Sequence, residues 1–227
     1  MIISHKHKFI FLKTRKTAGT SIEIALSRLC GDRDIITPIG QDERFRREFS
    51  HRGSQNFRVA SPEREPNDGR PRKEVDYYNH IPAERVRVLI GTAIWDEYYK
   101  FCFERNPWDK AISLYFWLTR NRDPRPTLLE FLRRENRKGK GSRLSNFNIY
   151  SIGGDVAVDH VGLYENLDFE LERITALLNL PNYLELPKAK GYTREDWRHY
   201  REVMRHEERN LVAQACAREI AFLGYCF

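Results

Sequence analysis

The segment that decides the fold reads Lys8-Phe-Ile-Phe-Leu-Lys13, followed without a break by Thr14-Arg-Lys-Thr-Ala-Gly-Thr-Ser21. The first part is an apolar run short enough for a buried strand, and the second is a polar loop. Apolar residues then recur at helical spacing from Ile22 and Leu26 up to Gly31, a residue type that commonly ends helices. The pattern predicts a strand, a loop and an amphipathic helix, with the loop where α/β folds bind their ligands.

A second unit repeats this plan later in the chain. Large apolar residues alternate over Tyr99–Arg105, and Asn106-Pro107 then opens a helix that is expected to run to about Arg122. Asn is a preferred N-cap residue, and Pro is favoured at the first helical position. Between the two units, Arg85-Val-Arg-Val-Leu-Ile-Gly91 predicts a further buried strand.

The remainder of the chain continues the alternation of strands and helices. A strand is predicted over 156–163, a helix over 166–180, and two helices over 193–227. Strands that alternate with helices favour a parallel sheet covered by helices. We therefore predict one α/β domain over residues 1–227, P-loop-like, with a central, mainly parallel sheet flanked by helices.

Composition excludes several classes of protein. The chain has 227 residues, 41% of them hydrophobic, and a formal net charge of +7. A chain of this length buries about 70% of its unfolded surface, so wholesale disorder is excluded and disulfides are not required. No apolar run approaches the roughly 18 residues of a membrane helix, and the N-terminal run is too short for a signal peptide. We therefore predict no membrane span and a cytoplasmic location.

Two sequence features bear on metals and charge. The four cysteines form no C-x-x-C pair, so neither a zinc ribbon nor a redox motif is indicated, and we expect reduced packing residues. Residues 44–73 hold nine Lys or Arg against four Asp or Glu, and residues 133–143 hold six Lys or Arg and one Glu. We predict a basic, loop-rich insertion at about 41–79 and a second basic loop at 133–143.

The loop from Lys13 to Ser21 has a composition that suits an oxyanion. Gly19 lets the backbone approach a ligand, Thr20 and Ser21 offer hydroxyls, and the first helical turn presents N–H groups. Lys16 would neutralise the anion's charge. The loop is not a Walker A motif, because its lysine precedes a single glycine. A capped helix with a solvated basic turn is the alternative.

Taken together, two motifs resemble one family. Lys16-Thr-Ala-Gly-Thr-Ser21 after an apolar strand resembles the 5′-phosphosulfate loop of sulfotransferases that use 3′-phosphoadenosine 5′-phosphosulfate (PAPS). That family also carries an Arg at the end of a later strand and a Ser eight residues on, which hold the 3′-phosphate, and Arg105 and Ser113 stand at that spacing. The resemblance implies a PAPS site with no metal. The residues we predict at this site are Arg15, Lys16, Thr17, Ala18, Gly19, Thr20, Ser21, Arg105, Ser113 and Lys190.

The resemblance also implies the catalytic residues. His80 lies in Tyr77-Tyr-Asn-His-Ile-Pro-Ala, which is similar to the family segment whose His acts as the acceptor base, and histidine suits base work near neutral pH. Lys16 would stabilise charge on the oxygen between sulfur and the 5′-phosphate. A helix-capping or buried structural role is the alternative for His80. His160, in a predicted strand, is the other histidine that could line a cleft.

The implied reaction moves a sulfuryl group from PAPS to an acceptor hydroxyl, giving adenosine 3′,5′-bisphosphate. The motifs look most like carbohydrate sulfotransferases of the 2-O-sulfotransferase type, although Arg15 replaces the Pro that many relatives have before the loop lysine. The acceptor is expected to be a carbohydrate or small molecule, and the basic insertion would suit an acidic saccharide.

Two other classes of protein are alternatives. A small-molecule kinase could use the same loop for ATP, but the Walker A order and an evident carboxylate site for Mg²⁺ are missing. A nucleic-acid-binding module could use the basic segments, but no nucleic-acid motif accompanies them. We therefore expect no nucleic acid partner, and the oligomeric state stays open.

Overall fold

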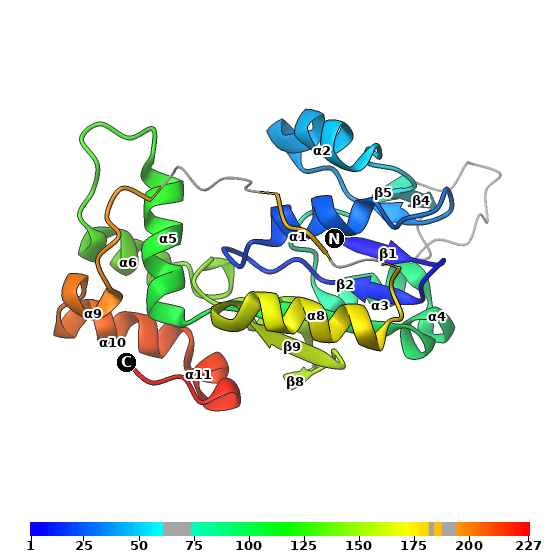
Figure 1. Cartoon of the computed structure of the whole chain (residues 1–227). Helices are drawn as coiled ribbons and strands as arrows, with labels where there is room; N and C mark the ends of the chain where they lie inside the picture. The colour runs from blue at the N-terminus through cyan, green and yellow to red at the C-terminus, as the bar shows by residue number, and fades with distance from the viewer. Residues whose placement is uncertain (61–73, 182–183, 188–193) are drawn as a thin grey trace, which may run out of the picture. The chain divides into compact units, whose positions relative to one another are not determined.

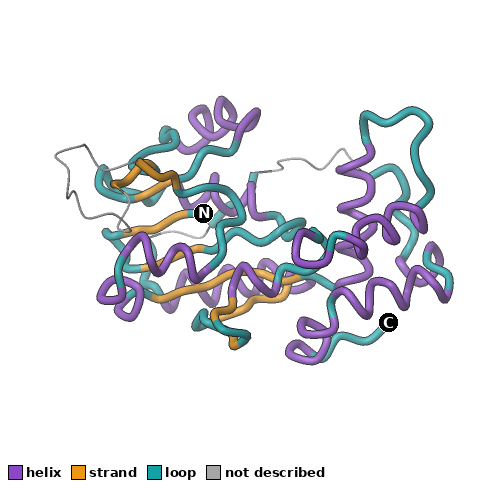
Figure 2. Tube along the Cα trace, turned by 180° about the vertical axis from the view of Figure 1, so that it is seen from behind, coloured by secondary structure: helices purple, strands orange, loops and turns teal. Residues whose placement is uncertain are grey.

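The computed structural model of the protein describes residues 1–60, 74–181, 184–187 and 194–227 (Figure 1). Two compact units share the chain. The first comprises Met1–Thr14, Ala18–Phe103 and Asn148–Ala189, and the second comprises Arg15–Thr17, Glu104–Phe147 and Lys190–Phe227. Figure 2 shows the strands of the first unit in orange, whereas the second unit is mainly helical. Lys190 lies outside the described residues.

The first unit is built on a five-stranded sheet in the order β3-β1-β2-β6-β9. Its strands are β3 (Ile35–Ile36), β1 (Ile2–Ser4), β2 (Phe9–Phe11), β6 (Tyr99–Glu104) and β9 (His160–Leu163). β1 pairs antiparallel with both β2 and β3, and β2 pairs parallel with β6. β3, β2 and β6 therefore run in the same direction, as expected for an α/β fold with a mainly parallel sheet. The predicted strand over 156–163 is two separate strands, because β8 (Asp155–Val156) pairs with β7 (Ser151–Ile152).

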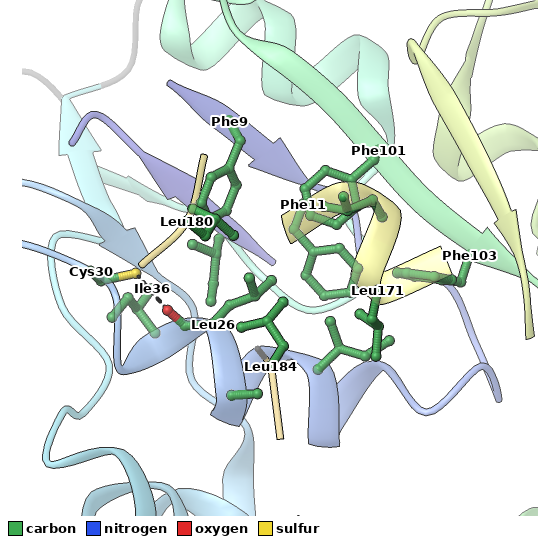
Figure 3. Packing of buried hydrophobic residues seen from close by; sticks show 14 residues of the cluster. Phe9, Phe11, Leu26, Cys30, Ile36, Phe101, Phe103, Leu171, Leu180 and Leu184 are labelled. Carbon is green, nitrogen blue, oxygen red and sulfur yellow. Dashed lines mark hydrogen bonds between the residues drawn. The ribbon is translucent and has the colours of Figure 1, made fainter. Parts of the chain in front are cut away.

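One face of this sheet carries the core of the first unit. Side chains alternate between the two faces of a strand, so Phe9 and Phe11 of β2 and Phe101 and Phe103 of β6 project to the same side. They pack against α1 (Gly19–Ser27) and α8 (Leu167–Leu177), as Figure 3 shows. The first strand, loop and helix, and the later helix over 166–180, are thus close to their predicted positions.

The second unit packs around Trp108. Its helices are α5 (Pro107–Thr119), α6 (Leu128–Arg137), α9 (Tyr200–Val203), α10 (His206–Ala215) and α11 (Ala217–Leu223). Buried members of this core include Ile112, Phe131, Tyr200, Val212 and Cys216. Three helices stand where two were predicted at the C-terminal end, since the backbone breaks at Cys216 with φ −114.

The predicted strand over 85–91 is wrong. These residues belong to α3 (Ala83–Ile90), which is followed by α4 (Thr92–Glu97). Burial falls on Ala83 and Val86, three residues apart, while Val88 is 44% exposed. That spacing is helical, and the apparent alternation of valines misled the sequence interpretation.

The two basic segments are more ordered than predicted. Within 41–79 the chain forms α2 (Glu43–Ser50), β4 (Arg58–Ala60) and β5 (Glu74–Asp76), and residues 61–73 lie outside the described part. Arg46 of α2 is fully buried and donates from Nη1 and Nη2 to the Thr37 carbonyl, both at 3.0 Å. The loop predicted at 133–143 is wrong over its first half, since α6 extends to Arg137 from a capping box formed by Thr127 and Glu130.

The remaining short elements and the cysteines complete the fold. Single turns are formed by α7 (Phe147–Tyr150) and by the 3₁₀ segments η1 (Gly40–Asp42), η2 (Gly139–Gly141) and η3 (Tyr164–Asn166). All four cysteines are free thiols, and Cys226 is the exposed one. Within the described part of the chain, no helix combines the length and apolar character needed to cross a bilayer.

The start of α5 provides a test of the fold. Asn106 is 9% exposed, and its Oδ1 accepts from the backbone N–H groups of Trp108 at 3.1 Å and Asp109 at 3.3 Å. We expect Asn106→Ala to lower the free energy of unfolding by about 1 kcal/mol, because two helix N–H groups lose their acceptor. Asn106→Asp keeps the acceptor and is the control. Urea unfolding followed by circular dichroism measures both, and equal losses would contradict the capping role.

Candidate active site

The loop between β2 and α1 has an unusual backbone. Lys16 has φ 63 and Ala18 has φ 58, so two residues with side chains adopt the left-handed conformation that favours glycine. Ala18 is the N-cap of α1, and no side chain of that residue caps the helix. The first turn of α1 therefore directs its N–H groups toward the loop without a capping side chain from the N-cap position, which is the arrangement that favours an anion.

Gly19 is required by a close contact. A Cβ at this position would lie 2.8 Å from Lys13 Cγ and 3.4 Å from the Thr14 carbonyl oxygen. Lys13 is 5% exposed, and its ammonium forms an ion pair with Glu23 of α1, which is fully buried. Burial alone would raise the pKa of Glu23, but the charges of Lys13 and neighbouring cations lower it to about 2. The glycine thus makes room for a buried lysine at the end of β2.

The other loop residues differ in exposure. Thr17 and Ser21 are buried, while Arg15, Ala18 and Thr20 are partly exposed. Lys16 is also partly exposed, and its Nζ lies 5.1 Å from the centroid of the Trp117 ring.

Asn146 forms two hydrogen bonds with the backbone of Arg15, within the second unit. Its Oδ1 accepts from the Arg15 N–H at 3.0 Å, and its Nδ2 donates to the Arg15 carbonyl at 3.2 Å. Asn146 is fully buried and also donates to Glu104 Oε1 at 3.2 Å. Sequence reasoning missed this residue, because it lies in a stretch without a motif.

The guanidinium of Arg15 is largely buried and lies near another arginine. Burial, and then the nearby Arg143, lower its pKa. Its Nη1 is buried and has no hydrogen-bond partner among the described residues. A buried guanidinium nitrogen that lacks an acceptor could donate a hydrogen bond to an anionic ligand.

Arg105 lies directly after β6 and contacts the loop. Its side chain is 11% exposed, and its Nη1 donates to the Lys16 carbonyl at 3.2 Å. Its Nε donates to Asp109 Oδ2 at 2.7 Å, and Asp109 Oδ1 accepts from Arg194 Nη1 at 2.6 Å. Burial would raise the pKa of Asp109, but the two arginines outweigh it and lower that pKa. Arg105 is therefore held in a fixed position by one carboxylate and one loop carbonyl.

Ser113 stands on the same face of α5 as Asp109, because the two residues are four apart on a helix. Ser113 is partly exposed. Arg105 is paired with Asp109, one helical turn before Ser113, and the role of Ser113 stays a prediction. Arg194 was missed in the sequence, although it follows the stretch 188–192 that contains Lys190.

A buried ion pair supports the strand end that carries Arg105. Glu104 is fully buried, and its Oε1 accepts from Lys110 Nζ at 2.8 Å and from the Arg105 N–H at 3.0 Å. Burial raises the pKa of Glu104, while Lys110 opposes that rise. The carboxylate thereby links the backbone at Arg105 to Lys110 of α5, within the second unit.

His80 has a defined hydrogen bond in the first unit. Its Nδ1 lies 2.9 Å from the Lys13 carbonyl oxygen. A carbonyl only accepts, so Nδ1 carries the proton, and in the neutral ring the lone pair is on Nε2. This is the protonation state that a general base requires.

His160, the other histidine considered, has a carboxylate partner. Its Nε2 lies 2.7 Å from Glu170 Oε2 of α8, and both side chains are largely buried. The structure thus gives His160 a partner that accounts for its position.

Comparison with known proteins identifies the family. The sequence profile of the sulfotransferase family matches residues 1–224. The chain belongs to the sulfotransferase family. This protein is therefore an enzyme that transfers sulfuryl groups, and sulfotransferases generally use PAPS as donor. The kinase alternative is not favoured.

One relative of this sulfotransferase comes from Archaeoglobus fulgidus. That protein, described as uncharacterized, is 30% identical over 113 residues, which cover 47% of this chain and 88% of the relative. A comparison with solved structures found no match.

Proposed function

We propose that this sulfotransferase transfers the sulfuryl group of PAPS to an acceptor hydroxyl and releases adenosine 3′,5′-bisphosphate. The observation that carries the proposal is the hydrogen bond from Arg105 Nη1 to the Lys16 carbonyl. It joins the two motifs, which are far apart in the sequence, through a direct contact within the second unit. PAPS carries anionic groups at both ends of its ribose, so a selective site needs two sets of cationic and N–H donors.

The residues present fit this donor. Lys16, the first turn of α1 and the guanidinium of Arg15 would bind the 5′-phosphosulfate, while Arg105 and Ser113 would bind the 3′-phosphate. Lys190 is proposed as a further phosphate contact, although it lies outside the described residues. PAPS supplies the activated sulfuryl group when bound. The protein's part is to position it and to place positive charge beside the leaving phosphate oxygen.

His80 is proposed as the general base. With the proton of the ring on Nδ1, the Nε2 lone pair would accept the proton of the acceptor hydroxyl as the oxygen attacks sulfur. Lys16 would stabilise the negative charge that develops on the leaving oxygen. Neither role calls for a metal.

The acceptor is proposed to be a carbohydrate or small-molecule hydroxyl. The basic segments support an acidic saccharide less than their composition suggested, because several of their described cations are paired or buried. Arg52 pairs with Asp32 at 2.7 Å, Arg133 pairs with Glu207 at 2.6 Å, and Arg46 is buried. The class of acceptor therefore rests on the family resemblance.

A thermal-shift screen tests the donor. We expect adenosine 3′,5′-bisphosphate to raise the Tm by several degrees at a concentration about 100 times its Kd, because a ligand that binds only the folded state stabilises it by about 2.7 kcal/mol there. Adenosine 5′-monophosphate is the matched control, since it lacks only the 3′-phosphate. ATP tests the alternative hypothesis that the protein is a kinase. Stabilisation by ATP above that by adenosine 3′,5′-bisphosphate would overturn the proposal.

A further inference from the structure

Lys13 contacts two successive residues of the segment that carries the proposed base. Its carbonyl accepts from His80 Nδ1 at 2.9 Å, and its ammonium donates to Asn79 Oδ1 at 3.2 Å. The same ammonium is paired with Glu23, which is fully buried. One residue at the end of β2 therefore holds the side chains of Asn79 and His80 together, and all four residues belong to the first unit.

Asn79 is fixed from its other side as well. Its Nδ2 donates to the Pro38 carbonyl at 2.7 Å. The side-chain amide thus spans a lysine ammonium and a backbone carbonyl, which determines its orientation because its oxygen must face the ammonium. His80, the next residue, has φ 62, a left-handed conformation that persists only where the surroundings hold it.

The anchor of this segment is also part of the loop. The stem of Lys13 lies against Gly19, where a Cβ would approach Lys13 Cγ to 2.8 Å. Displacing Lys13 would therefore disturb both the start of α1 and the hydrogen bond of His80. The proposed base and the start of α1 therefore both depend on Lys13, within the first unit.

We propose that Asn79 is a positioning residue, which acts with Lys13 to hold the His80 ring with its proton on Nδ1. The inference rests on the proposed function, in which His80 is the base. Asn79 would not touch the donor or the acceptor. It would keep the backbone of His80 where its Nδ1 reaches the Lys13 carbonyl, so that the Nε2 lone pair is always the one offered for catalysis.

The test compares Asn79→Ala with the unaltered enzyme by spectroscopy and kinetics. Long-range ¹H–¹⁵N spectra of protein labelled at its seven histidines distinguish Nδ1–H from Nε2–H rings at about pH 8.5, where histidine is neutral, and His80→Asn assigns the His80 signal. We expect an Nδ1–H ring in the unaltered protein and a mixture of both forms in Asn79→Ala. Turnover, measured as adenosine 3′,5′-bisphosphate formed from PAPS with the best of a panel of hydroxyl acceptors, should fall by about 10- to 100-fold.

Two further variants separate positioning from general destabilisation. Asn79→Asp keeps an oxygen for the Lys13 ammonium, so His80 should retain its Nδ1–H ring. Its turnover should be at least about a third of the unaltered value, a smaller loss than that of Asn79→Ala. Asn56→Ala is the matched control, because Asn56 also has a positive φ of 50 and donates to the carbonyls of Asp32 and Asp34 at 2.7 and 2.9 Å. It should leave His80 and turnover unchanged.

The outcomes distinguish this inference from the proposed function. An Nδ1–H ring retained in Asn79→Ala, or equal losses of turnover in Asn79→Ala and Asn56→Ala, would overturn the positioning role. If His80→Asn remains fully active, the proposed base is wrong, whatever the spectra show. If His80→Asn is inactive while Asn79→Ala behaves like the unaltered enzyme, only the inference about Asn79 fails.

Discussion

His80→Asn is expected to lower the rate of adenosine 3′,5′-bisphosphate formation from PAPS by at least about 100-fold. A positioned general base contributes about 10²- to 10⁴-fold to such a reaction, and the Asn side chain cannot take up the proton. Asn is a suitable replacement, because it tolerates the left-handed backbone that His80 adopts at φ 62. The variant should therefore fold like the unaltered enzyme and differ in chemistry.

Binding of the nucleotide separates this effect from a damaged site. Calorimetry should give a Kd for adenosine 3′,5′-bisphosphate within about twofold of the unaltered value, a difference of less than 1 kcal/mol. His160→Gln is the control, since His160 is paired with Glu170 at 2.7 Å and has no role in the proposed reaction. Normal turnover in His80→Asn together with loss in His160→Gln would assign the base to His160 instead.

The parts of the fold that could be predicted are those set by local sequence. The strand, loop and helix over 8–31 combine an apolar run, polar residues and helical spacing, and each signal agrees with the structure. The start of α5 could also be predicted, because Asn106 is a preferred N-cap residue and its side chain accepts from the N–H groups of the first helical turn. In both cases the determinant lies within a few residues of its effect.

The errors arose where a short apolar pattern fits two periods. Residues 85–91 contain valines at alternate positions, which favours a strand, but their burial follows the three-residue spacing of α3. Basic composition was equally ambiguous. Arg46 has the same charge as its exposed neighbours in α2, yet it is buried against the Thr37 carbonyl, which only the tertiary structure determines.

The site shows the same division. Lys16, Arg105 and Ser113 follow from motifs, and the structure places Arg105 against the Lys16 carbonyl. The residues that contact the backbone of Arg15 and the side chain of Lys13 do not follow from motifs. Asn146 and Asn79 act through contacts with residues more than sixty positions away in the sequence, so no local pattern marks them.

Arg105→Ala is expected to weaken the binding of adenosine 3′,5′-bisphosphate by about 10- to 100-fold. Charge-assisted hydrogen bonds to a charged group are worth about 1.5–3 kcal/mol, and tenfold in affinity corresponds to about 1.4 kcal/mol. The structure adds a second contribution, because Arg105 also donates to the Lys16 carbonyl at 3.2 Å, so its removal frees the backbone of the loop. Arg105→Lys keeps the charge without the forked geometry and should recover only part of the loss.

The same variants show whether the loss comes from the 3′-phosphate. Adenosine 5′-monophosphate lacks that group, so Arg105→Ala should weaken its binding far less than the binding of adenosine 3′,5′-bisphosphate. Arg133→Ala is the matched control, since Arg133 is an exposed arginine of the same unit that pairs with Glu207 at 2.6 Å, and its removal should leave both affinities unchanged. An equal loss for the two nucleotides would place the effect of Arg105 on the loop alone and would exclude it as the 3′-phosphate ligand.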